Sequence, residues 1–208
     1  SCVNVFESRS NIIRNNKLYN SGRYCISMSG FDIYSWDGKK DLINPEPVYE
    51  NRNCYSHTND NIIAYNDCFG ASADSSDTAA INLWNTDPGN IVYSNYVHDC
   101  SSPFGFYFGI YVDDRCENTL IRKNIVKGLK EENGALDAVI MVKGLYNRVE
   151  NNIFVNNSPR RGVFQNYNDA DTDKYKTSKN NVFYNSGENL YHFTSCKTDK
   201  MQYSDRNI

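Results

Sequence analysis

A repeat of about 29 residues runs along this chain, and every copy carries an asparagine between two short apolar stretches. The copies align on these asparagines, which are Asn16, Asn66, Asn95, Asn124, Asn152 and Asn181. Successive asparagines are 50, 29, 29, 28 and 29 residues apart. No copy contains a helical pattern long enough to form a crossover helix. A constant period of this kind predicts a solenoid in which each repeat is one coil of short strands.

Apolar residues keep fixed distances from each asparagine. The position three residues before the asparagine is apolar in every copy but one, where it is Ser178. The apolar residues there are Ile13, Ile63, Val92, Ile121 and Val149. The position two residues after the asparagine is apolar in all six copies, namely Leu18, Cys68, Val97, Val126, Phe154 and Phe183. A further apolar stretch lies midway through each repeat, at residues 24–28, 79–84, 108–113, 138–142, 162–165 and 190–193. The pattern predicts an all-β fold, namely a right-handed single-stranded parallel β-helix of about six to seven coils, the hand following the general rule for parallel crossovers.

The recurring asparagine has a physical role in such a stack. Neighbouring coils lie about 4.8 Å apart, so a side-chain amide at the same turn of every coil can bond the amides above and below it. Asparagine also tolerates the left-handed backbone that such turns need. We therefore expect the asparagines to form a ladder inside the stack.

The first interval between asparagines exceeds the repeat by 21 residues, since 50 − 29 = 21. The surplus fits residues 35–56, a stretch that contains Trp36, Gly38, Pro45 and Pro47. We interpret this stretch as a loop inserted into one turn of a single domain that covers residues 1–208. The repeat pattern is already running where the sequence begins and where it ends, so we expect the chain to be a fragment of a longer β-helix.

Charge and composition narrow the range of partners. The net charge is −3 and the isoelectric point is about 5.6, which favours neither nucleic acid nor an anionic membrane surface as a partner. The sequence has no run of about 18 apolar residues, so no membrane span is predicted. The seven cysteines are an odd number without metal-ligand spacing, which favours small buried side chains; one or two disulfides remain an alternative for a secreted protein.

Alternation along the midway strands places several polar side chains on one outer face. With Ile81 and Leu83 inside, Asn82 and Trp84 point outward. In the same way, Ile110 and Val112 point inward in the next coil, and Tyr111 and Asp113 point outward.

The following coil adds a basic group to this face. We expect Val139 and Met141 inside and Lys143 at the strand end, 29 residues after Asp114. Asp77 precedes the strand of Trp84, and Arg161 precedes the next strand along the stack. The sequence thus predicts one exposed surface that combines an aromatic side chain, carboxylates and cations.

A groove of this composition suits a carbohydrate. The aromatic ring can stack on a sugar face, and paired carboxylates can serve as general acid and as base or nucleophile in glycoside hydrolysis. We take Asp77, Asp113 and Asp114 as candidate catalytic residues, and Trp84, Tyr111, Lys143, Asn82 and Arg161 as candidate substrate-binding residues. The structural alternative is that the Asp113–Asp114 pair closes a turn and that the others are ordinary surface residues.

Four segments also carry a family resemblance: SSDTAAINLW, GNIVYSNYVHD, FGIYVDDRCEN and AVIMVKGLYNRVENNIFVN. They resemble secreted bacterial β-helix proteins of the pectin-lyase-like superfamily, among them glycoside hydrolases that act on polysaccharides. The resemblance spans about residues 61–157 and implies a polysaccharide or oligosaccharide partner, an extracellular or periplasmic location, no cofactor, and roles for Asp77, Asp113 and Asp114 in catalysis. It departs from the family pattern at Asn82, where a tyrosine is expected.

Two alternatives stay open. The segment VKGLYNRVENNIF is similar to the catalytic coil of alginate and chondroitin lyases, with Lys143 and Asn147 at the matching offset. Leu136 and Ala138 stand where those lyases carry acidic calcium ligands, so we predict no metal site and favour hydrolysis over calcium-dependent elimination. The other alternative is a non-catalytic structural or adhesive module, because β-helices serve in both capacities.

Overall fold

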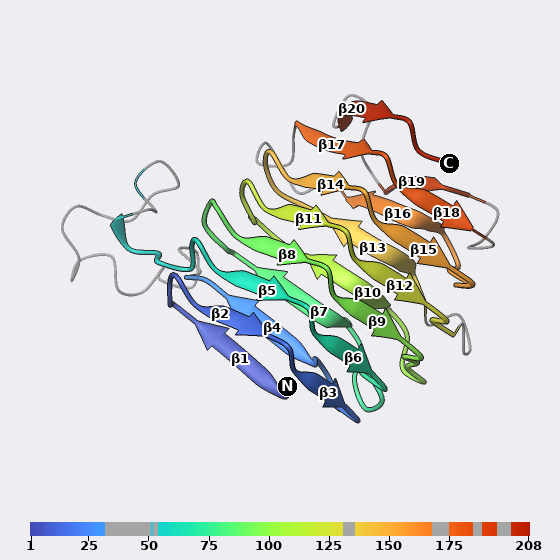
Figure 1. Cartoon of the computed structure of the whole chain (residues 1–208), viewed down its shortest axis with the longest axis horizontal. Helices are drawn as coiled ribbons and strands as arrows, with labels where there is room; N and C mark the ends of the chain where they lie inside the picture. Colours follow the sequence, from blue (N-terminus) through green and yellow to red (C-terminus); the bar gives the residue numbers. More distant parts are fainter. Residues whose placement is uncertain (32–50, 52–53, 131–135, 168–174, 185–188, 195–200) are drawn as a thin grey trace.

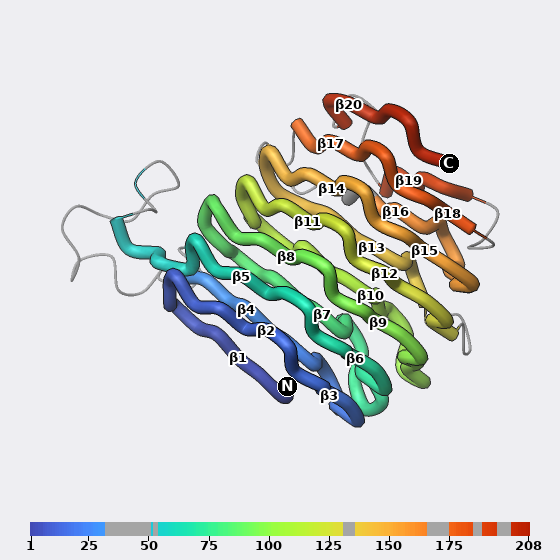
Figure 2. Tube along the Cα trace, in the orientation of Figure 1, coloured from blue at the N-terminus to red at the C-terminus, as the bar shows by residue number. Residues whose placement is uncertain are grey.

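The computed structural model describes residues 1–31, 51, 54–130, 136–167, 175–184, 189–194 and 201–208. These residues form three parallel sheets, and successive turns of the chain stack from β1 to β20 (Figures 1 and 2). No α-helix occurs in these ranges, and hence none that could cross a membrane. The predicted parallel β-helix is confirmed. Most of the inserted loop predicted at residues 35–56 lies outside the described residues.

Sheets A and B each take one strand from every turn that the structure describes, and sheet C takes one from every such turn but the last. Sheet A contains β1 (Val3–Phe6), β4 (Ile26–Ser29), β7 (Thr78–Trp84), β10 (Tyr107–Val112), β13 (Ala138–Val142), β16 (Gly162–Tyr167) and β19 (Tyr191–Thr194). Sheet B contains β2 (Ile12–Arg14), β5 (Ile62–Ala64), β8 (Ile91–Tyr93), β11 (Leu120–Arg122), β14 (Arg148–Glu150), β17 (Lys176–Lys179) and β20 (Met201–Asp205). Sheet C contains β3 (Lys17–Tyr19), β6 (Asp67–Phe69), β9 (Tyr96–His98), β12 (Ile125–Lys127), β15 (Ile153–Val155) and β18 (Val182–Tyr184).

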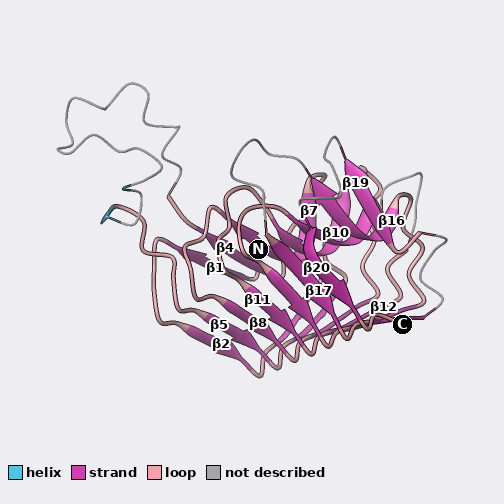
Figure 3. Ribbon diagram, turned by 90° about the horizontal axis from the view of Figure 1, so that it is seen from above, coloured by secondary structure: helices cyan, strands magenta, loops and turns pink. Residues whose placement is uncertain are grey.

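Equivalent residues of neighbouring coils lie side by side. Val92 pairs with Ile63 and Ile121 in sheet B, and Val97 pairs with Cys68 and Val126 in sheet C. Figure 3, turned to look from above, shows these coils one behind another around a shared interior. The apolar positions on both sides of the repeated asparagine fill that interior, as the pattern predicts. The core is therefore a set of columns, each built from the same position of successive repeats.

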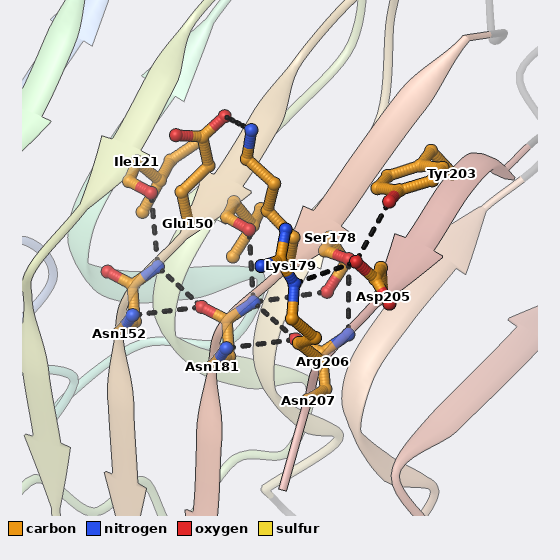
Figure 4. A network of polar contacts seen from close by, with 11 residues as sticks. Ile121, Glu150, Asn152, Ser178, Lys179, Asn181, Tyr203, Asp205, Arg206 and Asn207 are labelled. Carbon is orange, nitrogen blue, oxygen red and sulfur yellow. Dashed lines mark hydrogen bonds and ion pairs between the residues drawn. The ribbon is translucent and has the colours of Figure 1, made fainter.

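The predicted asparagine ladder is present and extends one step further than the repeat alignment. Each side-chain Nδ2 donates to the Oδ1 of the next coil over 2.9 to 3.0 Å, through Asn16, Asn66, Asn95, Asn124, Asn152, Asn181 and Asn207. Figure 4 shows its last steps, from Asn152 through Asn181 to Asn207. The same Oδ1 atoms also accept a hydrogen bond from the backbone N–H of the preceding ladder asparagine. For example, the N–H of Asn95 donates to Oδ1 of Asn124 over 2.9 Å. The ladder thus satisfies polar groups that the turn would otherwise bury unpaired.

The turn itself explains why asparagine recurs there. The residue before every ladder asparagine has a left-handed backbone, with φ between 48 and 58°: Asn15, Tyr65, Ser94, Lys123, Asn151, Asn180 and Arg206. This left-handed residue bends the chain between sheets B and C. The turn conformation and the ladder together fix the register of each coil on the last.

A second, shorter ladder lies at the entrance to sheet B. Asn11 donates to Asn61 over 2.9 Å, and Asn61 donates to Asn90 over 3.0 Å. Thr119 interrupts the series, although its backbone N–H still donates to Oδ1 of Asn147 over 2.8 Å.

One expected side-chain direction is wrong. Met141 pairs with Tyr111 and lies with it in an apolar cluster on the outer side of sheet A, whereas Ile140 and Val142 belong to the interior. Val139 is in the interior cluster as predicted. Two consecutive interior residues, Val139 and Ile140, break the strict alternation, and the frame of outward residues shifts by one. The outer cluster consists of Ala79, Phe108, Tyr111, Ala138 and Met141, with Phe106 packed against it.

Candidate functional site

An open cavity of about 410 Å³ lies on the outer face of sheet A, over β4, β7 and β10. We call it the sheet A cleft. Its lining residues are Arg23, Tyr24, Ser27, Ser29, Asp77, Asn82, Trp84, Asp113 and Asp114. The cleft thus brings together all three candidate catalytic aspartates and two of the candidate binding residues, Asn82 and Trp84.

Lys143 joins two of these aspartates from the neighbouring coil. Its Nζ lies 2.7 Å from Oδ1 of Asp113 and 2.7 Å from Oδ1 of Asp114. The side chains of Lys143 and Asp113 are 11% and 14% exposed, while that of Asp114 is 34% exposed. Asp114 is therefore the more open of the two carboxylates, and Asp113 is largely withdrawn from water.

Burial sets the protonation behaviour of this group. The pKa of Asp113 is raised to about 6, chiefly by burial, and the negative charge of Asp114 contributes to the rise while Lys143 opposes it. Burial alone would lower the pKa of Lys143, but Asp113 and Asp114 outweigh it and the pKa is raised. Lys143 therefore stays cationic at ordinary pH, and Asp113 can exchange a proton near neutrality.

Tyr111 lies beneath these charges, in the outer apolar cluster, and does not line the cleft. Only 2% of its surface is exposed. The Nζ of Lys143 lies 5.4 Å from the centre of its ring. The outward direction predicted for Tyr111 is correct. Because the side chain is buried beneath Lys143, however, almost none of its surface can contact a ligand.

Backbone hydrogen bonds hold the two aspartates over β7. The N–H of Asp113 donates to the carbonyl of Leu83 over 2.7 Å, and the carbonyl of Asp114 accepts from the N–H of Asn85 over 2.8 Å. These bonds continue the parallel pairing of β7 and β10 beyond the end of the strand. These bonds fix the backbone of both aspartates against β7, which restricts where their carboxylates can lie.

Asp77 and Asn82 also line the cleft. Asp77 precedes β7 in a left-handed conformation with φ of 48°, and its carbonyl accepts from the hydroxyl of Tyr24 over 3.4 Å and from Nη2 of Arg23 over 3.3 Å. Asn82 is 4% exposed, and its Oδ1 has no hydrogen-bond partner within the described parts of the chain. A buried acceptor at the floor of a polar cleft can receive a ligand O–H or N–H.

Arg161 lies apart from the cleft. Its Nε is 3.3 Å from Oδ1 of the fully buried Asp137, which also accepts from Nη2 of Arg160 over 2.6 Å. Another guanidinium nitrogen of Arg161 donates to Thr194 on β19 over 3.4 Å. Asp137 and Thr194 hold Arg161 where β13 and β19 flank β16, away from the coils that line the cleft.

Four lining residues escaped the sequence analysis: Arg23, Tyr24, Ser27 and Ser29. Ser27 pairs with Asn82 and Ser29 with Trp84 in the register of β4 and β7. The repeat period could have placed these serines, but the long first interval obscured the register. Arg23 and Tyr24 come before the strand, and their residue types alone gave no signal.

Within the described residues, no three or more histidine, cysteine, aspartate or glutamate side chains lie together so that they could hold a metal ion. No protein-family model, curated protein or solved structure matches this chain. The parallel β-helix therefore stands on the repeat and on the strand pairing, and the interpretation of the cleft stands on its own chemistry.

Proposed function

We propose that this protein is a carbohydrate-active β-helix protein that hydrolyses glycosidic bonds of a polysaccharide bound in the sheet A cleft. The observation that carries the proposal is the buried Asp113 carboxyl, with a pKa raised to about 6, in the same cleft as Asp77 and Asp114. A carboxyl that keeps its proton up to about pH 6 suits a general acid, and an ionised neighbour suits a base or nucleophile.

The roles follow from burial and contacts. Asp113 acts as the acid that protonates the leaving-group oxygen. Asp77 acts as base or nucleophile, because Asp114 shares the Lys143 ammonium with Asp113. Trp84 supplies an apolar platform for a sugar ring, and Asn82 offers a buried acceptor for a sugar hydroxyl. A secreted location, extracellular or periplasmic, fits a polymeric substrate and belongs to the same proposal.

The test is a hydrolysis screen against a panel of polysaccharides, with release of reducing ends as the readout. Asp113→Asn and Asp77→Asn should each reduce the rate by at least about a hundredfold, the usual range for a lost acid or base. Asp99→Asn is the matched control, since Asp99 follows β9 and lies off sheet A. Full activity in both cleft variants on a substrate that the wild-type protein cleaves would end the proposal.

The lyase alternative assigns the proton-abstracting role to Lys143. Two aspartates hold that ammonium and raise its pKa, which makes it a poor base at neutral pH. Elimination would release unsaturated products that absorb in the ultraviolet, whereas hydrolysis would not. The same screen with an absorbance readout therefore separates the two reactions.

The non-catalytic alternative draws on the same ion pairs, because Lys143 and its two aspartates also fasten neighbouring coils together. In that case the cleft binds a saccharide or nothing at all. Binding measured by calorimetry without any release of reducing ends or unsaturated products would favour this alternative.

A further inference from the structure

Cysteine side chains from two sheets meet at one corner of the coil. Cys2 and Cys25 immediately precede Val3 and Ile26, which pair in the register of β1 and β4. Cys68 lies across from them in β6, and both Cys25 and Cys68 are fully buried in the interior cluster. The cysteines that the structure describes are free thiols.

The contacts of Cys25 place its sulfur against Cys68. Its Sγ lies 3.4 Å from the carbonyl oxygen of Leu18 and 4.0 Å from that of Phe69. Leu18 is the register partner of Cys68, and Phe69 is the next residue after it. The sulfur of Cys25 therefore lies against the backbone that carries Cys68.

Other nearby cysteines are less suited to pair with Cys25 or Cys68. Cys2 is exposed, and its Sγ is directed to the carbonyl of Tyr19 at 3.9 Å. The Sγ of Cys100 donates to the carbonyl of His98 over 3.3 Å, one coil further along. Cys25 and Cys68 are both fully buried, and the sulfur of Cys25 lies against the backbone that carries Cys68.

Packing alone does not require sulfur at these positions. The register partners of Cys68 are Leu18 and Val97, and Ala80 occupies the place of Cys25 in the next coil. All are simple apolar residues that fill the same columns. Two buried cysteines whose chain segments lie against each other, one before β4 and one in β6, therefore suggest a role beyond filling space.

We propose that Cys25 and Cys68 form a disulfide bond when the protein folds in an oxidising compartment, and that this bond fastens sheet A to sheet C beside the sheet A cleft. Arg23 and Tyr24, which line the cleft, directly precede Cys25. The bond would hold this wall of the cleft to β6. The proposal does not depend on the chemistry proposed for the cleft, because no cleft residue takes part in forming the bond.

The reaction is an ordinary thiol–disulfide exchange with a small disulfide such as oxidised glutathione. The Cys25 thiolate attacks one sulfur of the oxidant, forms a mixed disulfide and releases one thiol. The Cys68 thiolate then displaces the second thiol, so two protein thiols are oxidised and one disulfide is reduced to two thiols. Because both sulfurs are buried in the folded chain, the exchange takes place before the coils close.

Peptide mapping tests the pairing on the full chain without any substitution. Protein made in the periplasm of a bacterial host is alkylated under denaturing conditions and digested with trypsin and Asp-N. This digestion puts Cys2, Cys25, Cys68 and Cys100 into separate peptides, at residues 1–9, 24–31, 67–73 and 99–112. The expected product is peptide 24–31 linked to peptide 67–73, which separates on reduction. Alkylated Cys25 and Cys68 in that sample, or Cys25 linked to Cys2, would overturn the proposal.

A stability comparison gives an independent measurement. The oxidised protein should have a thermal midpoint roughly 8 °C above that of the same protein made in a reducing cytoplasm, as expected for a cross-link between residues 43 positions apart. Cys2→Ser should keep both the linked peptide and the difference in midpoint. Equal midpoints for oxidised and reduced protein would contradict a bond that fastens the two sheets.

Discussion

The Nζ of Lys143 lies 2.7 Å from Oδ1 of Asp113, and the two residues stand at the same end of adjacent strands in sheet A. Both side chains are mostly buried, so the pair is shielded from solvent. Such a pair links two coils by their side chains, in addition to the backbone bond from the N–H of Lys143 to the carbonyl of Val112.

Replacing Lys143 with methionine should lower the free energy of unfolding by about 3 kcal/mol, because it leaves carboxylates buried without their cation. It should also raise the pKa of Asp113 above about 6, since the charge of Lys143 is the strongest influence that lowers it. Urea denaturation measures the first effect, and a carboxyl NMR titration measures the second. Lys127→Met, at an exposed position of β12, should change stability by less than about 0.5 kcal/mol.

The raised pKa of Asp113 makes stability depend on pH. The folded state raises this pKa from 3.8 to about 6, so folding favours the protonated form. The resulting contribution is fully present below pH 3.8 and is lost as the pH rises through about 6. Asp113→Asn should remove this decline, which is visible as a flatter plot of unfolding free energy against pH between these values. A plot with the wild-type slope would show that another group titrates there.

The proposed hydrolysis gives a separate expectation for the pH profile of activity. If Asp113 is the acid, kcat/KM should fall as the pH rises through about 6, because the proton is lost. The charge of Asp114 raises the pKa of Asp113, so Asp114→Asn should move this alkaline limb to lower pH. A limb that moves to higher pH, or stays in place, would contradict the assignment of Asp113.

The position of an asparagine in the ladder should decide how much it stabilises the protein. Asn124 is fully buried, accepts from Asn95 and donates to Asn152 and to the carbonyl of Val92. Asn124→Ala should lower the free energy of unfolding by about 3 kcal/mol, because it leaves buried polar groups unpaired. Asn16→Ala, at the half-buried first position of the same ladder, should cost about 1 kcal/mol or less. Equal losses in chemical denaturation would show that burial does not set the ladder energy.

Gly144 follows Lys143 at a turn where a side chain has no room. Its φ is 80°, and an added Cβ would lie 2.0 Å from the carbonyl oxygen of Cys116. Gly105 has a similar φ of 84° but nothing within 4 Å of the same atom. Gly105→Ala should therefore cost about 1 to 2 kcal/mol for the left-handed backbone alone, and Gly144→Ala markedly more. Thermal unfolding of the two variants isolates the steric part, and similar losses would mean that the turn at Gly144 relaxes easily.

The repeat made most of the fold predictable. The spacing of Asn66, Asn95 and Asn124 gave the coil period, and the structure places these residues in one ladder. Asn207 joins the same ladder, but it follows Asn181 by 26 residues and fell outside the repeat alignment. A change in coil length hides a ladder position from spacing, although the hydrogen bonds tolerate it.

The candidate site was harder to predict because it depends on depth as well as direction. Alternation placed Trp84, Tyr111 and Asp113 correctly on the outer side, but it could not tell that Phe108 and Met141 would bury Tyr111. Alternation also failed where Val139 and Ile140 both turn inward. Arg161 was grouped with the cleft by its place in the chain, whereas Asp137 holds it elsewhere. Burial and ion pairing depend on neighbours from several coils, which no single repeat specifies.

Every amide in the main ladder points the same way, with Nδ2 toward the coil that follows. Their dipoles add along the axis, and each hydrogen bond polarises the next. A ladder bond in the middle of a tall stack is then stronger than the same bond near either end. Stability should therefore grow faster than in proportion to the number of coils, which gives this solenoid a degree of cooperativity that contacts between nearest neighbours alone would not provide.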